Sequence, residues 1–76
     1  MELLKILGER LKDLREEADL TQKDMAGKMG CTTSHYQKIE YGKVNISASM
    51  LNFLADYFHV SADYLLGRTD SREVNS

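Results

Sequence analysis

The sequence predicts a single small all-α domain of five helices. Its 76 residues contain no proline, the residue that most often interrupts helices. Apolar residues recur at spacings of three and four, as they do in helices that bury one face. Threonine or serine stands directly before four of the expected helices, where its side chain can cap the first turn. These observations favour helices joined by short turns.

The first helix is expected over residues 2–17. Its leucines lie three and four residues apart and therefore share one helix face. The members of this face are Leu4, Leu7, Leu11 and Leu14.

A pair of short helices separated by a glycine turn is predicted over residues 21–40. Thr21 and Asp24 form a capping box that opens the second helix, and Gly30 ends it. Thr32 caps the third helix, which should cover residues 33–40. Together they form a helix-turn-helix, an arrangement that can project its second helix into the DNA major groove. The inner positions of the pair are Met25, Ala26, Met29, Tyr36 and Ile39.

Two further helices complete the predicted domain. Ser47 caps the fourth, and Ser61 caps the fifth, which Gly67 closes. We therefore assign residues 1–67 to the domain and expect residues 68–76 to be a disordered polar tail.

The charge of the chain is unevenly distributed. Its net charge of −2 has the wrong sign for binding a polyanion. Residues 22–45, however, carry four basic and two acidic side chains, whereas the segments on both sides are net acidic. A positive face on an acidic body is consistent with DNA binding, although charges scattered in this way are also common on solvated surfaces.

The outward face of the third helix is polar. At 100° per residue, Tyr36 and Ile39 point inward, which leaves Ser34, Gln37 and Lys38 outside and Thr33 at the edge. Hydroxyl, amide and ammonium groups can bond base edges and phosphates. No carboxylate is expected on this face, which favours DNA binding over a merely solvated surface.

Arg15 is expected at the edge of the leucine face, where an unpaired charge would be costly to bury. Glu40 is the acidic residue on the inner side of the third helix. We predict an Arg15–Glu40 ion pair that ties the first helix to the third. Removing one member of a buried pair typically costs about 3–5 kcal/mol.

Residues 6–67 resemble the XRE family of helix-turn-helix regulators, which includes phage repressors and Cro proteins. The resemblance rests on ERLKDLREEADLTQKDMAGKMG, KIEYGK and LADYFHVSADYLLGRTD, with arginine and glutamate at Arg15 and Glu40. It implies a lambda-repressor-like DNA-binding fold and a double-stranded DNA operator as partner. We expect a transcriptional regulator that acts as a repressor.

The resemblance also implies roles for individual residues. In the family, the residue at Gln22 contacts the DNA backbone and neighbouring bases, the recognition helix reads bases, and the following loop contacts phosphate. The reading positions are Thr33, Ser34 and Lys38, and the loop positions are Lys43 and Asn45. The chain departs from the family pattern at Gly27, His35, Tyr36 and Ile46.

The fourth helix has more apolar surface than one core needs. Leu51, Leu54, Ala55 and Phe58 suffice to face the core, and Met50, Phe53 and Tyr57 form a second stripe. We predict a homodimer built on this stripe, which would bind a pseudo-palindromic operator. The alternative is that the stripe packs beneath the tail or the fifth helix.

Other chemistry finds little support in the sequence. Cys31 and His35 are four residues apart, but His59 is distant and no further metal ligand is evident, so we expect no metal and no cofactor. The Cys–His pair lacks an orienting acid and a cleft to hold substrate, so we do not expect an enzyme. With no second domain for sensing, we expect no small-molecule ligand. A single cysteine, the lack of a signal-like start and the lack of an apolar run of about 20 residues favour a cytoplasmic protein away from membranes.

One alternative from another functional class stays open. The acidic net charge would also suit a protein-interaction module, such as an antitoxin or an assembly partner that keeps the fold.

Overall fold

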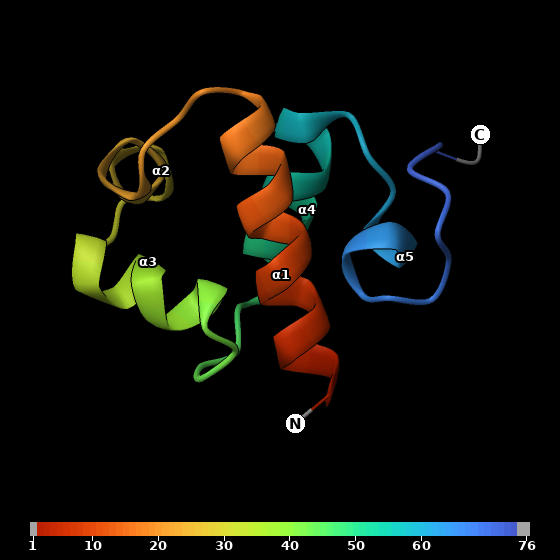
Figure 1. Ribbon diagram of the computed structural model, residues 1–76, viewed down its shortest axis with the longest axis horizontal. Coiled ribbons are helices and arrows are strands. Elements are labelled where there is room, and N and C mark those ends of the chain that lie inside the picture. Colours follow the sequence, from red (N-terminus) through yellow and green to blue (C-terminus); the bar gives the residue numbers. More distant parts are fainter. Residues whose placement is uncertain (1, 75–76) are drawn as a thin grey trace.

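The computed structural model describes residues 2–74 and confirms the predicted fold class (Figure 1). All of its regular elements within this range are helices. They are α1 (Glu2–Glu17), α2 (Gln22–Met29), α3 (Thr33–Glu40), α4 (Ala48–Phe58) and α5 (Ala62–Leu65). Within residues 2–74, each of these helices is too short or too polar to cross a bilayer.

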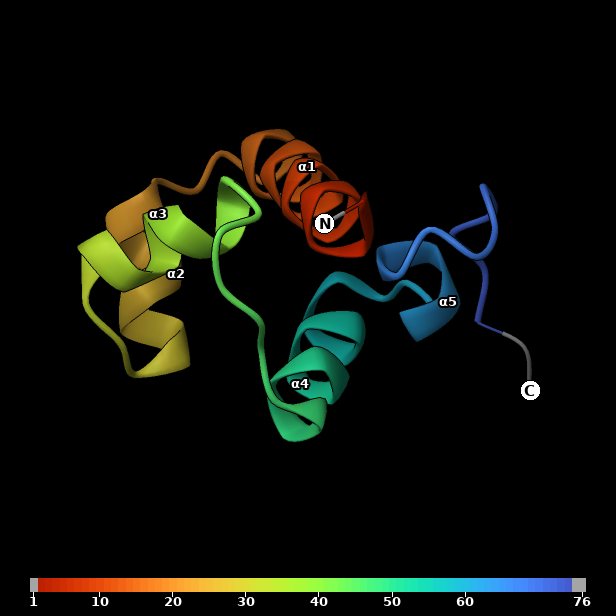
Figure 2. The ribbon, with the colours of Figure 1, turned by 90° about the horizontal axis from the view of Figure 1, so that it is seen from below.

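Helix α1 runs through the middle of the molecule. Figure 1 shows α2 and α3 on one side of it and α5 with the C-terminal segment on the other. Viewed from below, in Figure 2, α4 lies across from α1 and closes the remaining side. The helix-turn-helix pair is therefore carried on one flank of the domain, away from α5.

The predicted helix starts are present. Thr21 and Asp24 exchange both hydrogen bonds of a capping box, over 2.9 and 3.0 Å. These bonds, from the backbone of Thr21 first, hold the pKa of Asp24 below its ordinary value. The hydroxyl groups of Thr32, Ser47 and Ser61 each accept a backbone N–H of the helix that follows. Hydroxyl capping thus sets where these four helices begin.

The hydrophobic core lies where α1 meets the other helices. Leu11, Met25, Tyr36, Leu54 and Leu65, one from each helix, are fully buried in it. Leu7 and Leu14 are buried beside them, whereas Leu4 is only half-buried at the start of α1. The other buried apolar residues are Ala26, Ile39, Ala55, Val60 and Tyr64.

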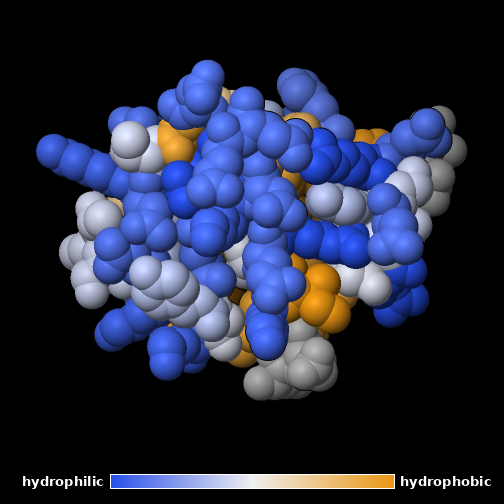
Figure 3. Space-filling model, in the orientation of Figure 1, coloured by the Kyte–Doolittle hydropathy of each residue, from blue (hydrophilic) through white to orange (hydrophobic). Residues whose placement is uncertain are grey.

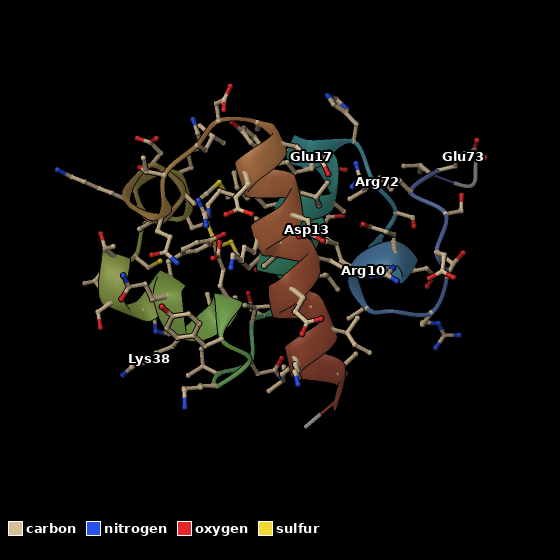
Figure 4. The ribbon with its side chains drawn as sticks, viewed as in Figure 1. Arg10, Asp13, Glu17, Lys38, Arg72 and Glu73 are labelled. Atoms are coloured by element: carbon tan, nitrogen blue, oxygen red, sulfur yellow. The ribbon has the colours of Figure 1, made fainter. Side chains whose placement is uncertain are left out.

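Residues 68–74 differ from the disordered tail expected from the sequence. Arg10 of α1 donates hydrogen bonds to the carbonyl oxygens of Tyr64 and Thr69, each over 2.6 Å. Arg72 donates to both carboxylate oxygens of Glu17 over 2.8 and 2.7 Å, and its carbonyl accepts the N–H of Ser61. Figure 4 shows Arg10, Glu17 and Arg72 between α1 and this segment. Charged side chains thus hold the segment against α1. The last two positions of the expected tail, 75 and 76, lie outside the described residues.

Candidate nucleic-acid interface

A tight turn sets the angle between α2 and α3. Gly30 ends α2 in the left-handed region with φ of +71°, a conformation that favours glycine. The next N–H, of Cys31, donates to the carbonyl oxygen of Ala26 over 3.0 Å, which completes the cap of α2. Thr32 then starts α3 at once. The short turn leaves α3 packed across both α2 and α1.

Arg15 and Glu40 meet between α1 and α3. The Arg15 Nε donates to Glu40 Oε2 over 2.6 Å, and its Nη2 donates to Oε1 over 3.2 Å. A third donor, Nη1, bonds the carbonyl oxygen of Leu20 over 2.9 Å. Only 11% of the Arg15 side chain and 1% of the Glu40 side chain are exposed. This two-point contact fixes the position of the end of α3 against α1.

The environment of this pair keeps both residues charged. Burial alone would raise the pKa of Glu40, but hydrogen bonds from its neighbours, Arg15 foremost, outweigh burial and hold that pKa below its ordinary value. The hydrogen bond to Glu40 raises the pKa of Arg15. Tyr36 lies beside the pair, and burial raises its pKa well above the usual range. Its buried hydroxyl makes no hydrogen bond with any described residue.

Two glutamines extend the pair toward the surface. Gln22, the first residue of α2, donates from Nε2 to Glu40 Oε1 over 3.1 Å. Gln37 of α3 donates from Nε2 to Gln22 Oε1 over 3.0 Å. The result is a continuous chain of hydrogen bonds from Arg15 through Glu40 and Gln22 to Gln37. Sequence reasoning missed this chain, because the amides belong to different helices and their spacing of 15 residues follows no helical period.

The Gln37 side chain is therefore less exposed and less mobile than the helical wheel predicts. It is half-buried, and one of its amide hydrogens is used inside the protein. A glutamine amide has a second N–H and an oxygen with two lone pairs, so it can still bond a base edge. The network holds that amide in one orientation.

The remaining predicted contact residues lie at the surface of the same flank. Ser34 and Lys38 are exposed on α3, and Thr33 is half-buried at its first turn. Figure 4 shows Lys38 pointing away from the protein. Lys43 and Asn45 are exposed in the loop after α3, where the Asn45 side chain accepts the N–H of Ile46 over 2.9 Å. The face of the molecule seen in Figure 3 is mostly hydrophilic over α2 and α3.

The stripe predicted on α4 is smaller than expected. Phe53 and Tyr57 are 37% and 38% exposed, and their rings stack with centroids 5.9 Å apart. The Nζ of Lys28 lies 5.3 Å from the centre of the Tyr57 ring. Met50 departs from the prediction, because it is half-buried against the core at the first turn of α4. The exposed part of the stripe is thus the Phe53–Tyr57 pair.

A helix-turn-helix family model matches residues 11–65, most of the chain. The chain belongs to the helix-turn-helix family of the XRE type. This membership agrees with the resemblance found in the sequence and with the five-helix architecture. The matched residues contain α2, α3 and both members of the Arg15–Glu40 pair.

Several curated proteins share this helix-turn-helix domain. The HTH-type transcriptional regulator ImmR of Bacillus subtilis (strain 168) is 33% identical over 69 residues, which cover 91% of this chain and 54% of ImmR. PrpR of Mycobacterium tuberculosis, a regulator of the same type, is 34% identical over 67 residues, covering 88% of this chain and 14% of PrpR. YqaE of Bacillus subtilis (strain 168) is 33% identical over 69 residues, covering 91% of this chain and 60% of YqaE. The chain thus spans about half the length of ImmR and YqaE and a small part of PrpR.

Proposed function

We propose that this chain binds double-stranded DNA in a sequence-specific manner and represses transcription, with α3 in the major groove. The observation that carries the proposal is the placement of Glu40. It is the only carboxylate of α3, and it is buried and neutralised by Arg15. The outward face of α3 consequently offers hydroxyl, amide and ammonium groups with no negative charge to repel phosphate.

The hydrogen-bonded chain from Arg15 to Gln37 supports the same function. Base readout requires side chains held in a defined orientation, because a bidentate contact with a base edge tolerates little misalignment. Gln22 and Gln37 hold each other at the junction of α2 and α3. Lys38, whose exposed side chain makes no hydrogen bond or ion pair with any described residue, is free to reach guanine or a phosphate. Lys43 and Asn45 continue this surface into the loop.

We further propose a homodimer that contacts DNA through two copies of α3. One short recognition helix with a hydroxyl-rich face discriminates weakly, and two-fold symmetry places two such helices in successive grooves about 34–36 Å apart. The exposed Phe53–Tyr57 pair on α4 is the apolar surface we assign to this contact. The operator would then be pseudo-palindromic.

The test is a selection of bound sequences from random double-stranded DNA, followed by affinity measurements at several salt concentrations. We expect an enriched motif with two inverted half-sites. The logarithm of affinity should fall linearly with the logarithm of salt concentration, because bound phosphates release counterions. Absence of any enriched motif, together with salt-insensitive binding, would favour the protein-interaction alternative that the acidic net charge suggests.

A further inference from the structure

A cleft lies where the turn between α2 and α3 meets the start of α4. Its volume is about 150 Å³, and residues from α2, the turn, α3, the following loop and α4 line it. The lining residues are Met29, Cys31, His35, Ile39, Asn45, Ile46, Ser47 and Met50. Of the proposed DNA-contact residues, Asn45 lines this cleft and those on α3 do not, so the cleft adjoins the proposed DNA surface at the loop.

Four of these residues carry donors for soft metal ions. Cys31 is a half-buried free cysteine in the turn, and His35 follows it at the first turn of α3. Met29 and Met50 approach from α2 and α4, and both are partly buried against the core. The lining of the cleft therefore includes a thiol, an imidazole and two thioethers, which come from α2, the turn, α3 and α4. The sequence alone indicated only the Cys31–His35 spacing, because it is the packing of α4 that brings Met50 to the same cleft.

We propose that this cleft binds one soft monovalent cation, of the Cu(I) class, through Cys31, His35, Met29 and Met50. Thiolate and thioether ligands select Cu(I), whereas carboxylate and carbonyl oxygens suit harder ions. No carboxylate belongs to the described lining of the cleft. Across residues 2–74, moreover, no three His, Cys, Asp or Glu side chains gather in a metal-binding arrangement, which disfavours a zinc site.

Charge balance points to the same ion class. Binding requires the Cys31 thiolate, so the thiol proton is released to solvent as the ion enters. The neutral imidazole and thioethers add no charge. One thiolate then neutralises one monovalent cation, whereas a divalent ion would keep a positive charge that no residue lining the cleft compensates.

The position of the cleft means that a bound ion would link separate helices. Cys31 lies in the turn of the helix-turn-helix, His35 on α3 and Met50 on α4. An ion held by all three would tie the recognition helix to α4. The inference rests on the cleft and its donors alone and does not depend on the proposed DNA binding.

The experiment is a Cu(I) titration of the reduced full chain, without oxygen and without DNA, in competition with a chromogenic Cu(I) chelator. We expect one ion per chain. Three variants should each bind Cu(I) at least about tenfold more weakly: Cys31→Ser, His35→Gln and the double change Met29→Leu with Met50→Leu. Loss of a residue that only supports a metal ligand already lowers metal affinity by about tenfold or more. The controls are Met25→Leu and His59→Asn, which alter a methionine and a histidine outside the cleft and should bind as the wild type does. Far-UV circular dichroism verifies that each variant is folded.

Three outcomes would overturn the proposal. They are failure of the wild type to bind Cu(I), tighter binding of Zn²⁺ than of Cu(I), and loss of binding in Cys31→Ser alone while the histidine and methionine variants bind normally. The last result would mean that a lone thiol reacts with the ion. Because no DNA is present, failure here is distinct from failure of the proposed DNA-binding function.

Discussion

Gly8 of α1 lies directly against the backbone carbonyl of Glu40 at the end of α3. A Cβ atom at position 8 would lie 2.7 Å from the carbonyl oxygen of Ile39 and closer still to that of Glu40. Side chains cannot approach backbone atoms so closely, so only glycine allows α1 and α3 to cross here. The crossing brings Arg15, two turns further along α1, within reach of the Glu40 carboxylate. Gly8 and the ion pair are thus two parts of one helix contact.

Gly8→Ala should destabilise the protein, although alanine is the better helix former. Alanine gains up to about 1 kcal/mol of helix propensity, but forcing backbone atoms apart in a packed contact costs roughly 1–3 kcal/mol. Gly27→Ala is the matched control, because Gly27 is also helical and a Cβ there would meet nothing within 4 Å. It should raise the free energy of unfolding by up to about 1 kcal/mol. Urea denaturation measures both, and a stabilising Gly8→Ala would show that α1 and α3 do not cross as described.

Removing one member of the Arg15–Glu40 pair should destabilise strongly. Arg15→Ala leaves a buried carboxylate with the Gln22 amide as its remaining donor, and Glu40→Ala leaves a buried guanidinium, each at a cost of about 3–5 kcal/mol. The double alanine variant should recover part of this loss, since neither charge then remains unpaired. Denaturant melts of the four proteins give the coupling energy. Strictly additive effects would mean that the side chains do not interact.

Stability should fall in acid partly because of Glu40. Its pKa is lower in the folded protein than in the unfolded chain, so the unfolded state binds the proton more readily. The stabilisation from Glu40 is therefore complete above the pKa of glutamate in the unfolded chain, about 4.3. It is lost as the pH falls through the lower pKa of Glu40 in the folded protein. Thermal melts between pH 7 and pH 3 should show a shallower loss in Glu40→Gln than in the wild type. Parallel curves would contradict this role.

Alanine at Lys38 or Gln37 should reduce sequence discrimination while leaving the fold intact. Loss of a good base contact costs about 1–3 kcal/mol of discrimination between the selected operator and other sequences. Arg68→Ala is the control for charge, because Arg68 is an exposed cation that pairs with Asp63 of α5, and α5 lies on the other side of α1 from α3 (Figure 1). The affinity of each variant for the operator is measured at one salt concentration. Unchanged operator affinity in both the Lys38 and the Gln37 variant would show that α3 does not read the operator sequence.

Phe53→Asp should dissociate the proposed dimer and weaken operator binding. A carboxylate placed in an apolar contact is desolvated without a partner, which opposes association. Val74→Asp, a change of an apolar residue that is 64% exposed in the C-terminal segment, serves as the control and should leave the dimer intact. Sedimentation at micromolar protein reports the oligomeric state. The dimer proposal is wrong if wild type and Phe53→Asp are both monomers with equal affinity for DNA.

The sequence by itself determined where the helices begin and which faces they bury. The starts of α2 to α5 each depend on a hydroxyl group and an N–H three residues away, as at Thr21 and Asp24, and such hydrogen bonds form within one turn whatever the rest of the chain does. The inward faces follow from the 3.6-residue period alone. The same period placed Arg15 and Glu40 on facing sides of α1 and α3, which is why this long-range pair could be predicted.

Only the tertiary structure decided how these helices meet. The angle at which α1 crosses α3 at Gly8 cannot be obtained from periodicity, since it depends on which backbone atoms come into contact. The same holds for the Gln22–Gln37 hydrogen bond, for the burial of Met50 over the cleft, and for Arg10 and Arg72 binding residues 68–74 to α1. Each of these contacts joins groups far apart in the chain, and its geometry is fixed by packing in three dimensions rather than by the local pattern that sets each helix.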